Sequence, residues 1–218
     1  MAELNISWET VQTISTEKKA VVTGESASEA TEEAPASPLR WTDKPIIIYV
    51  CDEAAGCEGF DKFEEVTLKD EKVALGMKAF RRVKMHPDDV EKDTVLQGEG
   101  REVPRMIVVE PESLKLTVLE GSKLKASKLF STMKSVAGKV FKEKLDKLVD
   151  EHLKILTEQD QIVNAQKVIN DKLGRLRGEN GKDRDIAELE EEGKELNEQM
   201  ADLAKKQKDL WTLTPKKA

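Results

Sequence analysis

Residues 141–178 read FKEKLDKLVDEHLKILTEQDQIVNAQKVINDKLGRLRG, and this stretch decides the fold of the C-terminal third of the chain. Its apolar residues recur at alternating intervals of four and three, which is the spacing of a coiled-coil seam. One seam position holds Phe141, Leu148, Ile155, Ile162, Ile169 and Leu176. The other holds Leu145, His152, Gln159, Gln166 and Leu173. We therefore predict a long helix whose seam is polar in three consecutive layers.

A second helical pattern follows a strong turn. Residues 178–181, Gly-Glu-Asn-Gly, interrupt the first pattern with turn-forming residues. Asp183 or Asp185 can then cap a new helix. Gly193 and Gln207 complete its seam, and the apolar seam residues are Ile186, Leu189, Leu196, Met200, Leu203 and Leu210. Two helices joined by a short turn run antiparallel, so we predict a helical hairpin over residues 138–218.

The outgoing helix of this hairpin is predicted to be the longer one. Starting near Ser127, it has about 50 residues and a length of roughly 75 Å at 1.5 Å per residue. Folding about Asn180 puts Trp211 beside Leu148, and it puts the three polar layers opposite residues 186–200. Polar seam layers lower stability and select pairing. We therefore expect the arm to dimerise or to hold a partner helix, and a plain solvated stalk is the alternative.

The middle of the chain, residues 40–137, has the pattern of a small α/β domain. Strand patterns are found in KPIIIYVC (44–51), RRVKM (81–85), VPRMIVVE (103–110) and LKLTVL (114–119). Helical patterns are found at 54–65, 69–80, 88–95 and from 123 onward. Pro-Glu-Ser separates the last two strands, which indicates a hairpin. The order strand, helix, strand, hairpin, helix is typical of one α/β domain.

Two short segments precede this domain. Residues 1–23 alternate loosely between apolar and polar side chains, and they are a candidate edge strand or short helix. Residues 24–39 read GESASEATEEAPASPL, which is rich in small and acidic residues. This composition is typical of a flexible linker.

Bulk properties exclude several classes of protein. The net charge of −7 argues against binding to a phosphate backbone. No apolar run is long enough to cross a membrane, and the first residues lack the pattern of a secretory signal. Two cysteines cannot build a disulfide framework. We therefore expect a cytoplasmic protein that binds neither nucleic acid nor membrane.

The domain at 40–137 resembles a thioredoxin-fold domain over just under half of the chain. The matching pieces are KPIIIYV (44–50), FRRVKM (80–85), EVPRMIVVEP (102–111) and LKLTVLEG (114–121). In that family a cis-proline follows a β-branched or small residue just before the third of these strands, and Val103-Pro104 matches this position. The resemblance implies a thioredoxin-like central sheet with flanking helices. It also implies a binding groove beside Val103, Pro104 and Cys57.

The family's thiol chemistry needs a Cys-x-x-Cys motif at the start of the first helix, where the helix dipole favours a thiolate. Aligned without gaps, that motif falls on Ala55-Gly56-Cys57-Glu58; with Cys57 leading, the resolving position is Phe60. The dithiol is absent in both registers. Cys51 can resolve Cys57 only if their Cα atoms come within about 7 Å. The alternatives are a single reactive thiol at Cys57, or a buried Cys51 beside an ordinary Cys57.

Other candidate chemistry is weaker still. His86 and His152 are too far apart in the inferred layout to share a metal, and no carboxylate spacing supports a site. Residues 98–104, GEGREVP, lead into a strand instead of opening a helix, so they indicate a turn and not a phosphate loop. We predict no metal and no cofactor.

These patterns predict an α/β fold with a thioredoxin-like sheet, followed by a long antiparallel α-helical coiled-coil hairpin. The expected function is a non-catalytic protein-interaction module. The hairpin is its docking or oligomerisation arm, for a protein partner or a second copy. One alternative is a thiol–disulfide oxidoreductase or single-thiol redox protein using Cys57, with Cys51 resolving. The other is a structural spacer.

Overall fold

The computed structural model describes residues 6–10, 44–52, 61–111, 113–178 and 182–216. The chain forms two compact units. The α/β unit contains Leu4–Asp146 and Leu213–Ala218, and the hairpin unit is built on Lys147–Thr212. The chain therefore passes from the first unit into the second and back again. The predicted linker at 24–39 and Cys57 lie outside the described residues.

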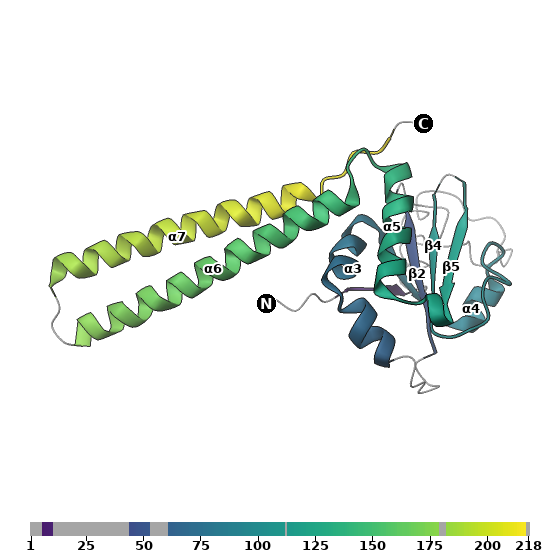
Figure 1. The fold of residues 1–218 in the computed structure, drawn as a ribbon, viewed down its shortest axis with the longest axis horizontal. Helices are drawn as coiled ribbons and strands as arrows, with labels where there is room; N and C mark the ends of the chain where they lie inside the picture. The colour runs from purple at the N-terminus through teal and green to yellow at the C-terminus, as the bar shows by residue number, and fades with distance from the viewer. Residues whose placement is uncertain (1–5, 11–43, 53–60, 112, 179–181, 217–218) are drawn as a thin grey trace, which may run out of the picture. The chain divides into compact units, whose positions relative to one another are not determined.

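A mixed β-sheet forms the centre of the α/β unit (Figure 1). Its described strands are β1 (Glu9–Thr10), β2 (Ile46–Val50), β3 (Arg81–Met85), β4 (Arg105–Val109) and β5 (Leu116–Glu120). They lie in the order β1-β3-β2-β4-β5. The pairs β1–β3 and β3–β2 are parallel, whereas β2–β4 and β4–β5 are antiparallel. β1 lies at the edge of the sheet, inside the segment for which an edge strand or a short helix was expected.

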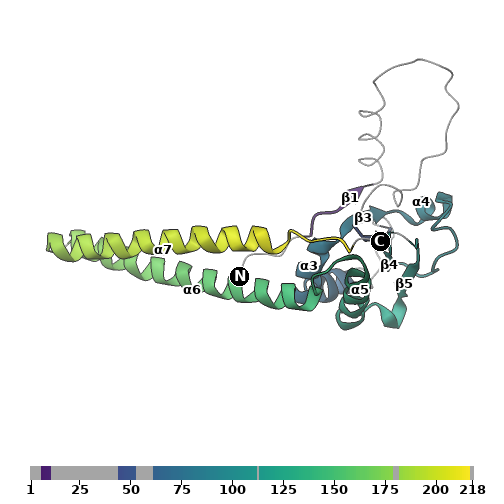
Figure 2. The ribbon, with the colours of Figure 1, turned by 90° about the horizontal axis from the view of Figure 1, so that it is seen from above.

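The continuous apolar run of β2 is buried on both faces, because no residue of Ile46–Val50 is more than 1% exposed. One face of the sheet packs on α4 (Pro87–Lys92). Val90 of α4 belongs to a buried cluster on this face that also contains Ile48 and Ile107. The other face is covered by α3 (Glu71–Gly76) and α5 (Ala126–Val140), as Figure 2 shows. The described part of this unit also contains three short helices: η3 (Phe63–Leu68), η4 (Met77–Ala79) and η5 (Gly121–Lys123).

The outgoing helix is not continuous, so the predicted start near Ser127 is wrong. α5 ends at Val140, and α6 (Leu145–Gly178) begins after a four-residue break. Phe141 has an extended backbone, with φ −111° and ψ 153°. It is buried and forms an isolated antiparallel bridge with Pro215. Phe141 therefore does not belong to the seam, although it continues the seven-residue spacing.

The end of the chain is bound to this break. The Lys142 backbone N–H donates to the Thr214 carbonyl (3.0 Å), and the Lys216 N–H donates to the Val140 carbonyl (2.7 Å). The Thr214 N–H donates to the Glu143 carboxylate (3.0 Å). We call residues 138–143 and 214–216 the clasp. The clasp brings the two ends of the hairpin segment together within the α/β unit, so the predicted hairpin boundaries of 138 and 218 are too wide.

The hairpin unit consists of α6 and α7 (Asp183–Leu210), which lie side by side and antiparallel (Figures 1 and 2). The prediction that Asp183 or Asp185 caps α7 is wrong, because the N-cap residue is Lys182 and no side chain makes a capping bond there. Both aspartates lie in the first turn of α7, where their negative charges interact favourably with the positive end of the helix dipole. In the described part of the chain, no helix has the length and apolar character that crossing a membrane requires.

Candidate functional site

Most of the candidate residues lie where neighbouring strands end, along one side of the sheet. We call this side the candidate edge. Val50 pairs with Met85 on one side and with Arg105 on the other, and Arg105 pairs with Glu120. The residues just beyond these positions therefore share this edge. They are Cys51 and Asp52 after β2, His86 after β3, Val103 and Pro104 before β4, and Gly121 after β5.

A groove of about 790 Å³ opens beside this edge. Its described walls come from residues 62–70 around η3, from residues 102–104, and from residues 121–127 at the start of α5. Phe63 and Pro104 are buried in its floor, whereas Val66 is 61% exposed. Lys62 and Lys125 contribute cationic side chains to the walls. The groove thus combines an apolar surface with a polar rim, which is typical of ligand sites.

Val103 presents unused backbone groups in this groove. The Val103–Pro104 peptide bond is cis, and Val103 itself is half-buried. Its N–H and C=O make no hydrogen bond to any other described residue. Buried backbone groups are nearly always paired. The Val103 peptide groups are therefore free to pair with the backbone of a ligand.

The loop before Val103 is fixed by Glu120. The Glu120 carboxylate accepts hydrogen bonds from the N–H groups of Arg101 (2.9 Å) and Glu102 (3.2 Å). These two bonds hold the pKa of Glu120 below its ordinary value of 4.5, and the charge of Arg105 acts in the same direction. The Arg105 guanidinium donates to the Glu102 carbonyl (3.2 Å). The position of Val103 is thus set by two charged residues of the β4–β5 hairpin.

Arg105 lies almost completely inside the unit, with 2% of its surface exposed. Its Nε has no hydrogen-bond partner among the described residues. Burial lowers the pKa of Arg105, and the negative charges of Glu120 and Glu91 oppose that shift. Gly100, with φ +76°, lets the loop pass close by, because a Cβ there would lie 2.8 Å from the Arg105 Cδ. Segment 98–104 is therefore a turn that wraps over a buried cation.

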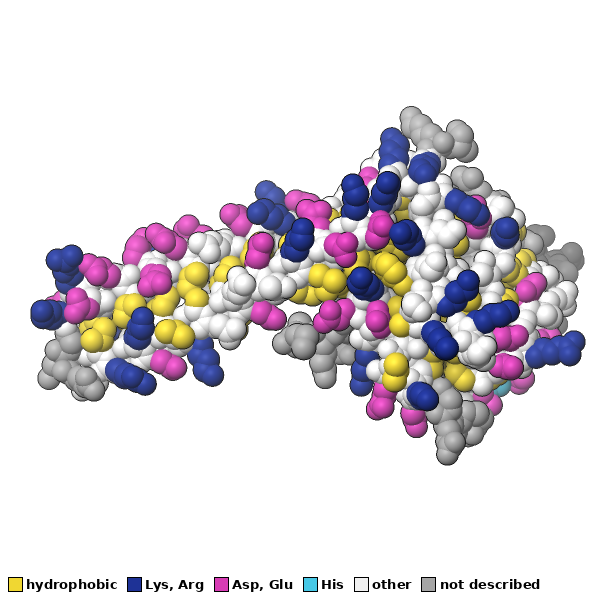
Figure 3. Space-filling model, in the orientation of Figure 1, with side chains coloured by type: hydrophobic (Ala, Val, Ile, Leu, Met, Phe, Trp, Pro, Cys, Tyr) yellow, Lys and Arg dark blue, Asp and Glu magenta, His cyan; other side chains and the backbone are white. Residues whose placement is uncertain are grey.

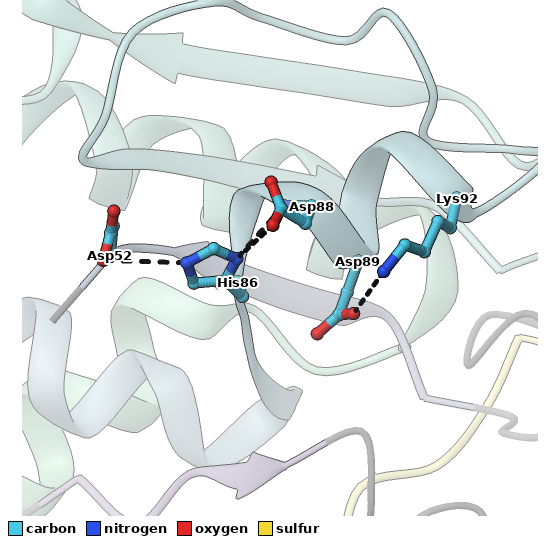
Figure 4. Close-up of polar contacts among 5 residues, drawn as sticks. All are labelled: Asp52, His86, Asp88, Asp89 and Lys92. Carbon is cyan, nitrogen blue, oxygen red and sulfur yellow. Dashed lines mark hydrogen bonds and ion pairs between the residues drawn. The ribbon is translucent and has the colours of Figure 1, made fainter. Parts of the chain in front are cut away.

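His86 lies at the candidate edge, between Asp52 and Asp88 (Figure 4). Its Nδ1 accepts a hydrogen bond from the Asp88 N–H (3.3 Å), which caps α4. Its Nε2 is 3.6 Å from an Asp52 oxygen, its Nδ1 is 3.6 Å from an Asp88 carboxylate oxygen, and a further ion pair in the view joins Lys92 to Asp89. The described residues contain no group of three or more His, Cys, Asp or Glu that would hold a metal ion. His86 acts here as a helix cap.

The structure describes Cys51 but not Cys57. Cys51 is 4% exposed, its N–H donates to the Met85 carbonyl (3.1 Å), and it is not among the described residues that line the groove. Cys57 falls in the segment 53–60, outside the described residues. The predicted Cys51–Cys57 pair therefore stays a prediction.

The three polar layers of the hairpin are covered by its own return helix. His152 contacts Trp211 (2.6 Å) and Gln207 (2.8 Å), with the indole N–H donating to Nδ1 of the imidazole. The remaining contacts are Gln159 to Gln207 (3.5 Å) and Gln166 to Asn197 (2.8 Å). The predicted placement of these layers opposite 186–200 is thus wrong for two of them. These two layers face residues 207–211.

A buried apolar cluster lies near the middle of the seam. Ile155, Ile162 and Leu203 form a buried cluster, against which Leu196, Met200 and Leu210 pack. Leu145, Leu148, His152 and Ile169 are also buried, whereas the residues nearest the turn are half-buried, namely Leu173, Leu176, Ile186 and Leu189. A shallow groove of about 450 Å³ lies between the helices beside Ala165.

Two walls of the α/β groove were not identified from the sequence. Val66 and the 121–127 segment carry no motif, and only the cis-proline position indicated where to look. Their signal is structural, because an exposed valine on a helix beside a half-buried turn marks a surface with unfilled apolar contacts.

Comparison with known proteins found no matching protein family, no similar curated protein and no similar solved structure.

Proposed function

We propose that the α/β unit is a thioredoxin-like, non-catalytic module that binds an extended segment of a protein partner in the groove beside Val103. The single observation that carries this proposal is the unpaired backbone of Val103 above an apolar floor. An extended peptide can pair its own main chain with such groups while a side chain enters the pocket.

The thioredoxin-like assignment is supported by the order of elements. The described elements follow the order strand, helix, strand, hairpin, helix in β2, α3, β3, β4–β5 and α5. Val103-Pro104 stands directly before β4, as the resemblance requires. Helices cover both faces of the sheet, and the groove opens beside the ends of its strands.

The walls of the groove favour a partner with an apolar side chain. Val66 is 61% exposed, and covering it removes an apolar surface from water. Burial of a valine side chain contributes about 1–2 kcal/mol, which is roughly tenfold in affinity. The hairpin unit then serves as the arm that docks or oligomerises the module.

Peptide binding can be tested with full-length protein and a randomised peptide library. Val66→Asp places a charge on the apolar wall, and we expect the selected peptides to bind it at least tenfold more weakly. Val163→Asp is the matched control, because Val163 is 53% exposed on α6 and lies outside the groove. Equal binding by wild type and Val66→Asp, or no selectable peptide at all, would count against the groove.

The non-catalytic assignment has its own test, in which the protein is assayed for thiol-dependent reduction of insulin. We expect no turnover above the rate with thiol alone, because the paired cysteine motif is absent and Cys51 is buried. Robust turnover that is lost in Cys57→Ser would favour the oxidoreductase alternative instead.

A further inference from the structure

The segment that contains α5 is basic in an acidic protein, and three of its lysines, Lys128, Lys134 and Lys139, lie on α5 itself. Residues 123–144 contain seven lysines and one glutamate, whereas the whole chain has a net charge of −7. Lys134 pairs with Asp146 (2.9 Å) and Lys139 pairs with Glu110 (2.8 Å). The other lysines make no ion pair among the described residues, namely Lys123, Lys125, Lys128, Lys142 and Lys144. Figure 3 shows basic side chains gathered over this part of the α/β unit.

Most of the outward side of α5 is exposed, and at its C-terminal end the Lys216 side chain donates a hydrogen bond to the Gly138 carbonyl. The apolar side of the helix packs inward through Leu129, Met133, Val136 and Ala137. Between the exposed lysines, the outward side carries Ser131, Ser135 and Gly138. These residues recur at helical spacing and have short side chains, so a second helix can approach the α5 backbone closely. We call this surface, with Lys128, Lys134 and Lys139, the basic face.

An acidic surface of opposite sign is present in the same chain. Acidic residues recur three and four apart on α7, and all are exposed: Glu188, Glu191, Glu192, Glu195, Glu198 and Asp202. Glu188 pairs with Arg184, and Glu191 with Lys194, within the same helix. The other four make no ion pair among the described residues. We call this surface the acidic face, and Figure 3 shows acidic side chains along α7.

The two faces match in length as well as in sign. From Glu188 to Asp202 the acidic face extends about 21 Å, and from Lys128 to Lys139 the basic face extends about 17 Å, at 1.5 Å per residue. Both lie on exposed helices that use their other sides for packing. A helix of one sign laid along a helix of the other sign pairs several charges at once, which gives specificity even when each pair is weak.

We propose that a second copy of this chain docks the acidic face of its α7 on the basic face of α5. Since each copy carries both faces, a two-fold dimer makes the contact twice. This assigns the occupant by charge complementarity, and it does not depend on the groove beside Val103. Because the contact is made by exposed charges, it weakens as salt rises.

Sedimentation equilibrium of the full-length protein tests the contact. We expect a dimer at 50 mM NaCl and a dissociation constant at least tenfold larger at 500 mM. Lys128→Glu with Lys139→Glu reverses the basic face, and Glu195→Lys with Glu198→Lys reverses the acidic face. Each reversed protein is expected to be monomeric at 50 mM NaCl, because like charges then meet at both contacts.

Mixing the two reversed proteins is the decisive experiment. In the mixed pair, both contacts again join opposite charges, so we expect the dimer to return. Lys167→Glu with Lys172→Glu on α6 is the matched control, because it makes the same change of charge elsewhere on exposed residues. This control is expected to dimerise like the wild type. Far-UV circular dichroism checks that each variant is folded.

Three outcomes would overturn the proposal. A wild-type protein that is monomeric at 50 mM NaCl has no such contact. A dimer that survives both charge reversals uses another surface. Reversed proteins that stay monomeric when mixed would mean that the faces do not meet between copies, and the basic face then binds a different acidic group.

Discussion

The side chain of His152 has no exposed surface and lies between two residues of the return helix. The indole N–H of Trp211 can only donate a hydrogen bond, so the Nδ1 atom of His152 accepts it. A neutral imidazole then carries its proton on Nε2, which lies 2.8 Å from Nε2 of the Gln207 amide; turning that amide by 180° places its oxygen there as the matching acceptor. An imidazolium ion would instead present a proton to the indole donor. The layer is therefore built around a neutral histidine with one defined tautomer.

Removing one partner of this layer is more harmful than removing both. Trp211→Phe removes the donor that faces the buried Nδ1 atom of His152, and loss of a hydrogen bond to a buried group costs about 1–3 kcal/mol. We expect amide hydrogen exchange of the hairpin around residue 152 to become at least fivefold faster. Adding His152→Leu to Trp211→Phe removes the unpaired group as well, so the double variant is expected to exchange more slowly than Trp211→Phe. Equal exchange in the wild type and Trp211→Phe would contradict this account.

The Glu120 carboxylate predicts a pH dependence of the loop before Val103. Its pKa in the folded protein is below the ordinary value of 4.5, because two backbone N–H groups and Arg105 stabilise the charged form. The stabilisation is present above pH 4.5 and is lost as the pH falls through the lowered pKa. We expect faster amide exchange at Arg101 and Glu102 only in this acid range.

Glu120→Gln is the control for this titration. It keeps an acceptor oxygen but removes the charge, so the acid-dependent change at Arg101 and Glu102 should disappear. Titration of these two amides near pH 7, or an unchanged acid response in Glu120→Gln, would exclude Glu120 as the cause.

At the scale of elements, the sequence predicted the strands and the two hairpin helices well. Apolar runs and seven-residue spacing arise from burial, and burial in these segments follows local pattern. The break at residues 141–144 was missed because KVFKEKL contains no proline or glycine, and Phe141 continues the heptad spacing. The break depends instead on Pro215 and Thr214, which are more than 70 residues away and pair with it only in the folded chain.

Gly193 is a position in α7 where a larger residue is expected to help. A Cβ there would lie 4.0 Å from the Ile169 Cγ2, which is an ordinary contact distance. Gly193→Ala should therefore stabilise the hairpin by about 0.5–1 kcal/mol through helix propensity. Chemical denaturation followed by circular dichroism measures this gain.

Gly100→Ala is the contrasting substitution. At φ +76° an alanine is strained, and its Cβ would lie 2.8 Å from the Arg105 Cδ. We expect a loss of about 1 kcal/mol or more. Two glycine-to-alanine changes with the same sign would mean that local geometry does not decide either of them.

At the scale of the whole molecule, the hairpin is an insertion into the α/β unit. Its residues Lys147–Thr212 form a separate unit, and the clasp joins the chain on either side of them. Replacing residues 147–212 by a short glycine-serine turn should leave a folded α/β unit with cooperative thermal unfolding. Deleting residues 138–218 removes the buried Phe141 and the clasp, so that protein should melt at a lower temperature. Loss of folding in both deletions would contradict the insertion.

The sequence predicted less of the candidate site than of the fold. Val103 and Pro104 were identified through a family resemblance, and Cys51 was correctly considered a candidate for burial. The exposed Val66, the loop anchor Glu120 and the buried Arg105 were not identified, because each has its role through contacts between segments that are distant in sequence. Charge pattern is local along a helix, so the two charged faces are visible in the sequence once the exposed sides of α5 and α7 are known.

The clasp has a consequence for the order in which the protein is made. Phe141 must meet Pro215, so this part of the α/β unit forms only after the ribosome has synthesised the hairpin and residues 214–216. Closing a loop of that length costs conformational entropy. Pairing of α6 with α7 supplies this closure, because an antiparallel hairpin returns the chain to its starting point. The hairpin thus also helps the α/β unit to fold, because it brings residues 214–216 back to the end of α5. A nascent chain stalled before Pro215 would have an α/β unit without the clasp.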